Sequence, residues 1–283
     1  MRTRTISAIG VVLVSLLPAF IGGWVFALAM AWVFILAWRE LIKLIENTDA
    51  FTRRFGTYLI LFACVAAQLW QENQGLPLVL VLLCLVPLTF VILPATGPVK
   101  ISDWSVRMGS VAYLALPAYA AVSIRNTAGS GPNWLSNAVD TMWGDPLLTE
   151  GFAWFLLALL VSWSSDTFAY LVGRSIGRTP LIPRVSPKKT VEGAIGGLVA
   201  AAFTAALVAH FGNLPIHVAV AFLLGIILGG LGMLGDLFES QLKRRAGVKD
   251  SSNAIPGHGG FLDRIDALIW VVLATFAMVP FLT

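Results

Sequence analysis

The feature that most constrains this chain is a series of long apolar stretches that carry almost no charge. A helix needs about 20 mostly apolar residues to cross a hydrocarbon layer of ~30 Å. The sequence contains nine stretches of roughly this kind, at 5–21, 23–38, 57–71, 76–93, 108–123, 151–172, 191–211, 214–234 and 266–282. Helices satisfy all their backbone polar groups within one segment, as lipid requires. We therefore predict an all-α integral membrane protein with about nine transmembrane helices.

The composition agrees with a chain that is surrounded by lipid. Hydrophobic residues make up 58% of the 283 residues, and charged residues only 12%. In a soluble domain about a quarter of the residues are charged. Both cysteines, Cys64 and Cys84, lie within apolar stretches and at no metal-ligand spacing. We interpret them as small core residues and not as a disulfide.

The placement of lysine and arginine predicts the orientation in the membrane. With nine spans and a cytoplasmic N-terminus, all but one of the 19 basic residues fall on the cytoplasmic side, the exception being Arg125. This asymmetry follows the positive-inside rule. It also explains the basic pI near 9.3 without nucleic acid as a partner.

The same topology divides the chain into three parts. We expect an N-terminal membrane region of about five spans at 1–125, an external loop at 126–150, and a C-terminal membrane region of about four spans at 151–283. Two cytoplasmic loops, 173–190 and 235–266, belong to the last region, and polar residues concentrate in the second of them.

That second loop contains side chains suited to phosphate chemistry. On a helix Asp236, Ser240 and Lys243 share one stripe, and Asp263 and Asp266 lie one turn apart at the start of the last span. Mg²⁺ prefers oxygen ligands and often shares itself with substrate phosphates. We therefore predict that Asp236, Asp263 and Asp266 hold Mg²⁺. The neighbouring cations that suit phosphate are Lys243, Arg244, Lys249 and Arg264.

A glycine-rich turn, His258-Gly259-Gly260, follows these cations. Its backbone N–H groups could form a nest for an anion. Taken singly, the lysines and arginines could be ordinary residues of a cytoplasmic connector. Such a connector has no need of three aspartates at the membrane boundary or of this turn, so we favour a functional site.

Three residues upstream are candidates for the same site. Asp166 lies within an apolar span, where a central carboxylate costs roughly 2.5–3.5 kcal/mol. Serines 162, 164 and 165 could satisfy it in a purely structural cluster, and we favour a functional role. Lys188 and Lys189 either anchor the following span or bind phosphate at a helix start.

The run from Ser240 to Asp266 resembles a known signature. It reads SQLKRRAGVKDSSNAIPGHGGFLDRID and is similar to the signature of the phosphatidate cytidylyltransferases, or CDP-diacylglycerol synthases. Two upstream runs, 164–170 and 186–193, also resemble that family. The resemblance covers about thirty residues, while the rest of the chain agrees mainly in size and in its many spans.

The resemblance implies an activity and a setting. CTP and phosphatidate would give CDP-diacylglycerol and pyrophosphate, with Mg²⁺ and, as a candidate second cation, K⁺. The enzyme would be a homodimer in the cytoplasmic (inner) membrane, with its active site facing the cytoplasm. The residues then expected in catalysis are Asp236, Lys249, Asp250, Asp263, Arg264 and Asp266. Those expected to bind substrate are Ser240, Lys243, Arg244, His258, Gly259, Gly260, Lys188, Lys189 and Asp166.

Other functions remain open at this level. One is a different lipid-headgroup transferase or a CTP-dependent lipid kinase, although the Asp-Gly-x2-Ala-Arg motif of CDP-alcohol phosphotransferases is absent. Another is an anion transporter, which would place polar groups near the middle of its spans. Apart from Asp166 and its serines, the polar cluster here lies at one surface, which favours an enzyme at the membrane interface.

Overall fold

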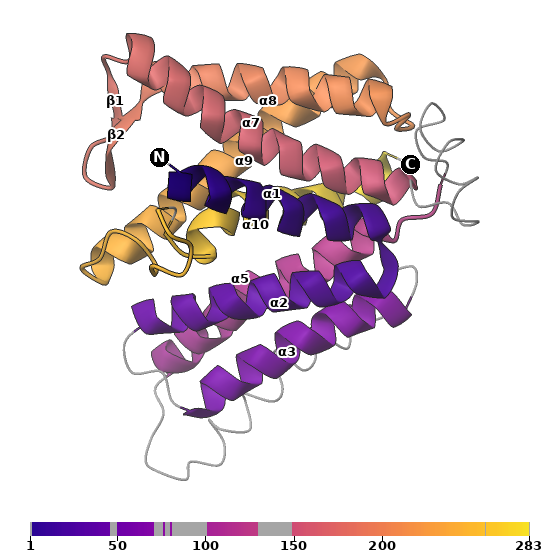
Figure 1. Ribbon diagram of the computed structural model, residues 1–283, viewed down its shortest axis with the longest axis vertical. Coiled ribbons are helices and arrows are strands. Elements are labelled where there is room, and N and C mark those ends of the chain that lie inside the picture. Colours follow the sequence, from indigo (N-terminus) through magenta and orange to yellow (C-terminus); the bar gives the residue numbers. More distant parts are fainter. Residues whose placement is uncertain are drawn as a thin grey trace.

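The computed structural model describes residues 2–45, 50–70, 76, 80, 101–129, 149–257 and 259–282, and the structural statements below concern these residues. They form a bundle built almost entirely of helices (Figure 1). The helices are α1 (Arg2–Ile21), α2 (Gly23–Leu44), α3 (Ala50–Leu69), α5 (Ile101–Arg125), α7 (Glu150–Ile176), α8 (Val191–Phe211), α9 (Val218–Arg245), α10 (Leu262–Met278) and a short 3-10 helix, η2 (Val279–Phe281).

The helices confirm an all-α membrane protein. Six in the described ranges are long and apolar enough to cross a membrane, namely α2, α3, α7, α8, α9 and α10 together with η2. The apolar part of α1 is shorter, and α5, which contains the predicted span 108–123, is not among the six. The predicted span 76–93, apart from residues 76 and 80, lies outside the described residues, as do Cys84 and most of the predicted external loop. The count of nine spans and the cytoplasmic N-terminus therefore stay predictions.

The bundle has two groups of helices joined by α10. In one group α7 packs along α8, α8 along α9, and α9 along α10. In the other group α3 packs against α2 and α5, and α10 contacts both α5 and α2 (Figure 1). Small residues let the helices of the first group approach closely, as they commonly do in membranes. A Cβ atom at Gly225 of α9, for example, would collide with the backbone of Ala201 in α8.

A short β-hairpin stands where the sequence predicts only a loop. Strands β1 (Pro180–Ile182) and β2 (Ser186–Thr190) pair antiparallel between α7 and α8. The hydroxyl of Thr190 caps α8 by accepting the N–H of Gly193 at 3.1 Å. In the first turn of α8, the Glu192 carboxylate accepts the backbone N–H groups of Arg178 and Thr179 at 3.1 and 3.2 Å. These contacts fix the hairpin, and with it the predicted lysines, to the end of α8.

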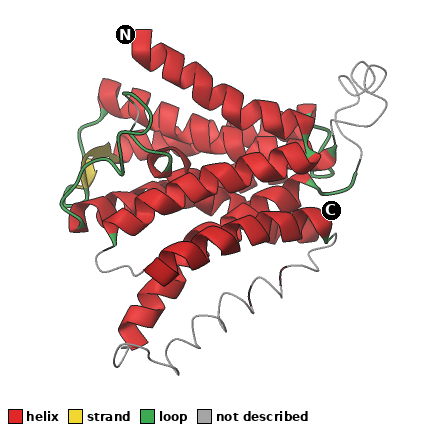
Figure 2. Cartoon of the chain, turned by 60° about the horizontal axis from the view of Figure 1, so that its bottom comes forward, coloured by secondary structure: helices red, strands yellow, loops and turns green. Residues whose placement is uncertain are grey.

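The ends of the bundle differ in character. The hairpin and the loop between α9 and α10 lie at one end, together with the start of α1, while the C-terminus lies at the other end (Figures 1 and 2). Arg125, the one basic residue predicted to lie on the external side, is at the end of α5. Its guanidinium donates to the carbonyl oxygen of Ala19 at 2.6 Å and to Thr149 Oγ1 at 2.9 Å. This separation agrees with the predicted topology, and the side that faces the cytoplasm stays a prediction.

Candidate active site

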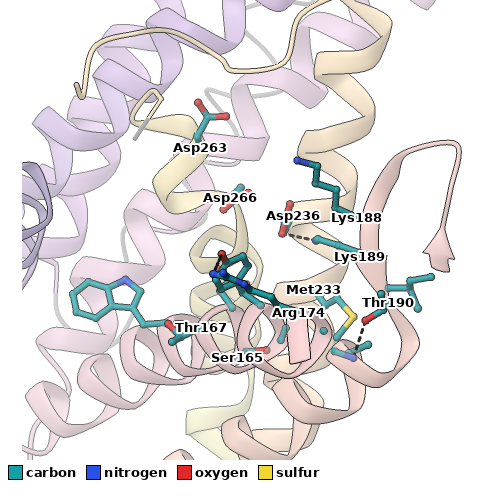
Figure 3. Close-up of a pocket in the computed structure, with 18 of the residues that line it drawn as sticks. Ser165, Thr167, Arg174, Lys188, Lys189, Thr190, Met233, Asp236, Asp263 and Asp266 are labelled. Carbon is teal, nitrogen blue, oxygen red and sulfur yellow. Dashed lines mark hydrogen bonds and ion pairs between the residues drawn. The ribbon is translucent and has the colours of Figure 1, made fainter. Parts of the chain in front are cut away.

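A cavity of about 810 Å³, lined in part by charged side chains, lies at the hairpin end of the bundle. Such a volume is in the range of small-molecule sites. The cavity is bounded by α7, α9, α10, the hairpin and the start of α8 (Figure 3). Val11 of α1 also belongs to its lining. It is lined by nine of the fifteen predicted site residues, which are Asp166, Lys188, Lys189, Asp236, Lys243, Asp250, Asp263, Arg264 and Asp266.

Three carboxylates from three helices form what we call the acidic cluster: Asp166 of α7, Asp236 of α9 and Asp266 of α10. All three side chains line the same cavity. Asp266 is only 8% exposed and accepts the N–H of Ala267 at 2.8 Å, whereas Asp166 is open to the cavity. Like charges held together repel, and a bound cation relieves that repulsion. The acidic cluster therefore favours a cation.

Strand β2 provides a positive wall opposite these carboxylates. Lys189 forms an ion pair with Asp236, and Lys188 lies beside it (Figure 3). The other carboxylate oxygen of Asp236 accepts the hydroxyl of Ser240 at 3.3 Å. The paired lysines thus belong to the cavity, and their position on a strand that leads into the N-terminus of α8 suits a phosphate ligand.

A second group of charges lies beside the acidic cluster. Lys243 forms ion pairs with Glu239, one turn earlier on α9, and with Asp263 Oδ1 at 2.6 Å. Glu239 is fully buried, and among the described residues neither of its carboxylate oxygens has a hydrogen bond beyond that ion pair. Sequence reasoning missed Glu239 because it lies beyond the predicted span 214–234, whereas Asp166 was singled out as an acid within a span.

The carboxylate of Asp263 accepts hydrogen bonds from the loop that follows α9. Its Oδ2 atom accepts the N–H and the hydroxyl of Ser251, at 3.0 and 2.9 Å, and the N–H of Gly260 at 2.7 Å. Gly259 adopts a φ of +82°, which favours glycine. The loop thus folds around Asp263. The predicted anion nest is therefore not free at Gly260, because its N–H already donates to a carboxylate.

The other predicted residues that the structure describes lie outside the cavity lining. Arg244 donates to the backbone carbonyl oxygens of Val185 and Val248, at 3.4 and 3.3 Å, and so joins α9 to the hairpin. Lys249 is exposed in the loop after α9, and Ser240 supports Asp236 from its own helix. His258 lies outside the described residues.

The predicted magnesium ligands are not gathered at one point. In the described ranges, no three His, Cys, Asp or Glu side chains stand close enough to hold one metal ion. Asp236 pairs with Lys189, and Asp263 pairs with Lys243. The chemistry of the acidic cluster nevertheless fits Mg²⁺, because its donors are carboxylate oxygens. Asp263 fits less well, since both of its oxygens already accept hydrogen bonds.

Glu40 of α2 is a second residue that sequence reasoning missed. Its carboxylate is buried and accepts hydrogen bonds from the loop after α9. The sequence holds no local signal for this role, because the partners lie more than 200 residues later in the chain. Only the packing of α2 beside α10 brings them together.

Comparisons with known proteins agree with the signature. The model of the cytidylyltransferase family matches residues 2–282. The phosphatidate cytidylyltransferase of Staphylococcus haemolyticus is 31% identical over 281 residues, which cover 96% of each chain.

Two further relatives match more strongly over a shorter stretch. The phosphatidate cytidylyltransferase of Bacillus subtilis is 46% identical over 122 residues, covering 43% of this chain and 45% of that protein. That of Aquifex aeolicus is 44% identical over 117 residues, covering 41% and 43%. These two alignments thus span less than half of the relatives' length. Because the family model extends along nearly the whole sequence, the chain belongs to the cytidylyltransferase family, as the run from Ser240 to Asp266 predicts.

Proposed function

We propose that this protein transfers the cytidylyl group of CTP to phosphatidate, which gives CDP-diacylglycerol and pyrophosphate. The observation that carries the proposal is the cavity at one end of a membrane helix bundle, where carboxylates of α7, α9 and α10 face the lysines of β2. The names of the relatives support the same reaction. We place the enzyme in the cytoplasmic membrane as a homodimer, with the cavity facing the cytoplasm.

The reaction requires positioning and charge compensation more than acid–base chemistry. A phosphate monoester has a second pKa of about 6, so the phosphate of phosphatidate is already an anionic nucleophile at neutral pH. It attacks the α-phosphorus of CTP, and pyrophosphate leaves with the electron pair of the broken P–O bond. No general base is needed. The obstacle is the repulsion between two polyanions that must meet.

The lining residues are suited to reduce that repulsion. Lys188 and Lys189 bring two cations to one wall, and Arg264 brings another from the first turn of α10. They hold the phosphates of the two substrates near each other and stabilise the charge that develops on the leaving pyrophosphate. Mg²⁺ held by Asp236 and Asp266, with Asp166 beside them, would supply further neutralisation of the triphosphate.

Lys243 has a different role from these three cations. It lies between Glu239 and Asp263, so its charge is already balanced by two carboxylates. We assign it to holding α9 and α10 together at the wall of the cavity. Asp263 can serve as a metal ligand only if Lys243 leaves its Oδ1 atom.

The membrane setting suits a lipid substrate. Large apolar side chains are exposed along α8, among them Ile195, Val199, Phe203 and Leu207, as expected for a face in contact with acyl chains. The cavity lining also includes the apolar Val11 of α1. The two acyl chains of phosphatidate can therefore stay in the bilayer while the headgroup enters the cavity.

The test uses purified protein in detergent with labelled CTP, phosphatidate and Mg²⁺. We expect a labelled CDP-lipid, and none when Mg²⁺ is removed with a chelator. Parallel reactions offer diacylglycerol as the acceptor. Formation of a phosphorylated lipid alcohol in place of CDP-lipid would support the lipid kinase. Binding of CTP without any turnover in micelles would support the transporter.

A further inference from the structure

Glu40, near the end of α2, reaches into the loop that carries the signature. It is only 5% exposed. Its Oε2 atom accepts the N–H of Leu262 at 2.8 Å and shares the single hydroxyl proton of Ser251, at 2.9 Å, with Asp263 Oδ2. Its Oε1 atom accepts the hydroxyl of Ser252 at 2.6 Å and the N–H of Phe261 at 3.0 Å. One carboxylate thus gathers four donors that lie between 211 and 222 residues later in the chain.

These contacts cap α10 from another helix. The first N–H groups of a helix have no partner within it, and a negative charge there is favourable. The residue at the cap position, Phe261, makes no side-chain cap hydrogen bond. Glu40 therefore fills this position with its carboxylate. In doing so it fixes where α10 begins relative to α2.

Ser251 connects Glu40 to the charges beside the cavity. The Ser251 hydroxyl oxygen lies 2.9 Å from Glu40 Oε2 and equally 2.9 Å from Asp263 Oδ2. Asp263 in turn contacts Lys243 through its other oxygen. A Cβ atom added at Gly260 would collide with both Glu40 and Ser251, so the loop closes tightly around this carboxylate.

We propose that Glu40 is a positioning residue for the reaction. It does not line the cavity, and it acts by holding the loop 246–261 and the first turn of α10. That turn carries Asp263 and Arg264, and Asp266 follows one turn later. The N-terminal region thereby becomes part of the framework of a site whose motif lies entirely in the C-terminal region. The inference rests on the proposed function.

Glu40→Gln tests the proposal with almost no change of shape. A glutamine amide has one oxygen that accepts and one NH2 group that only donates. Serine hydroxyls can rotate to accept from the NH2 group, but a backbone N–H cannot. In either amide orientation, the N–H of Phe261 or of Leu262 then faces a donor. We expect kcat to fall at least tenfold, and KM for CTP to change less than threefold, because the lysines of β2 are untouched.

Two further variants keep the test sharp. Glu40→Asp retains the charge and both acceptor oxygens, so it should restore kcat to within about threefold of wild type, as expected if the carboxylate is what matters. Ser252→Ala removes one of the four donors and leaves the others, so it should give a smaller loss than Glu40→Gln even if the latter folds poorly.

Trp38→Phe is the matched structural control. Trp38 lies on the same helix, is fully buried, and donates from Nε1 to the carbonyl oxygen of Arg53 at 3.0 Å. Its loss should lower the thermal midpoint without changing kcat at temperatures where the protein is folded. Arg39→Gln, at the exposed neighbouring position, should change neither quantity.

Hydrogen exchange provides a readout that does not depend on turnover. Amide exchange in residues 246–261 should be faster in Glu40→Gln than in wild type, and unchanged in Trp38→Phe. Wild-type synthesis of CDP-lipid in the same assay tests the proposed function by itself. If wild type turns over and Glu40→Gln matches it in kcat, the positioning role is refuted. Equal loop exchange in both proteins would refute it even if the activity were a different one.

Discussion

Replacing Asp236 by asparagine separates the contribution of this residue to folding from its contribution to charge. The amide keeps the shape of the side chain and can still accept the Ser240 hydroxyl, which lies 3.3 Å away. What is lost is the ion pair with Lys189, in which the two side chains are 26% and 25% exposed. At that exposure solvent screens the pair, and its contribution to stability is about 0.2–1 kcal/mol. The thermal midpoint should therefore fall by only a few degrees.

The loss of activity should be much larger than the loss of stability. Asp236 is the α9 member of the acidic cluster and the partner of a lysine in the opposite wall. We expect kcat/KM to fall at least 100-fold, which corresponds to about 2.7 kcal/mol of barrier. The assay is CDP-lipid formation across a titration of Mg²⁺, with thermal unfolding measured on the same samples.

The control for this prediction removes a carboxylate at the other end of the bundle. Glu150 accepts the indole N–H of Trp154 at 2.9 Å, and a glutamine oxygen can do the same. Glu150→Gln should leave turnover unchanged. If Asp236→Asn turned over within threefold of wild type at every Mg²⁺ concentration, the assignment of this carboxylate to cation binding and charge compensation would be wrong.

Three further predictions concern the extent of the site and the topology. Asp166→Asn should lower kcat at least tenfold, about 1.4 kcal/mol of barrier; normal turnover in a less stable protein would favour the structural cluster of serines. Arg264→Ala, at the cavity, should lower kcat/KM about tenfold, whereas Arg53→Ala, exposed outside it, should have little effect; equal losses in both would indicate impaired membrane insertion. A reporter fused after Thr283 should be active only as an external reporter, and cytoplasmic activity would contradict nine spans.

The fold was predictable from the sequence wherever one apolar segment makes one helix. The ends of the helices were less predictable, because hydropathy indicates where a span leaves the lipid and not where the helix ends. The predicted span 214–234 continues as α9 to Arg245, through polar residues that are good helix formers. The hairpin at 180–190 was missed for a related reason. Its strands are short, and the hairpin is held in place by hydrogen bonds to Glu192 and Thr190 at the start of the next helix.

The site was predictable wherever its residues are close in the sequence. The run from Ser240 to Asp266 contains five of the nine predicted residues that line the cavity. The pairing of Lys189 with Asp236 was not predictable, because it depends on how the hairpin lies against α9. The contact of Glu40 with the loop depends in the same way on how α2 packs against α10. Contacts between residues that are far apart in the sequence depend on helix packing, and the spacing of residues within a motif does not predict them.

Asp263 and Asp266 look equivalent in the sequence, but their surroundings in the structure differ. This difference gives the two carboxylates different roles. Asp263 accepts hydrogen bonds at both oxygens, so it is held by the loop and by Lys243. Asp266 lies one turn later, where residues three apart share a helix face, and its described hydrogen bond is to its neighbour Ala267. Because a helix turn is rigid, fixing Asp263 also fixes the direction in which Asp266 faces the acidic cluster. In the proposed reaction, the buried contacts of Glu40 and Asp263 preorganise Asp266, one of the carboxylates expected to hold a cation, as charge stabilisation in an active site requires.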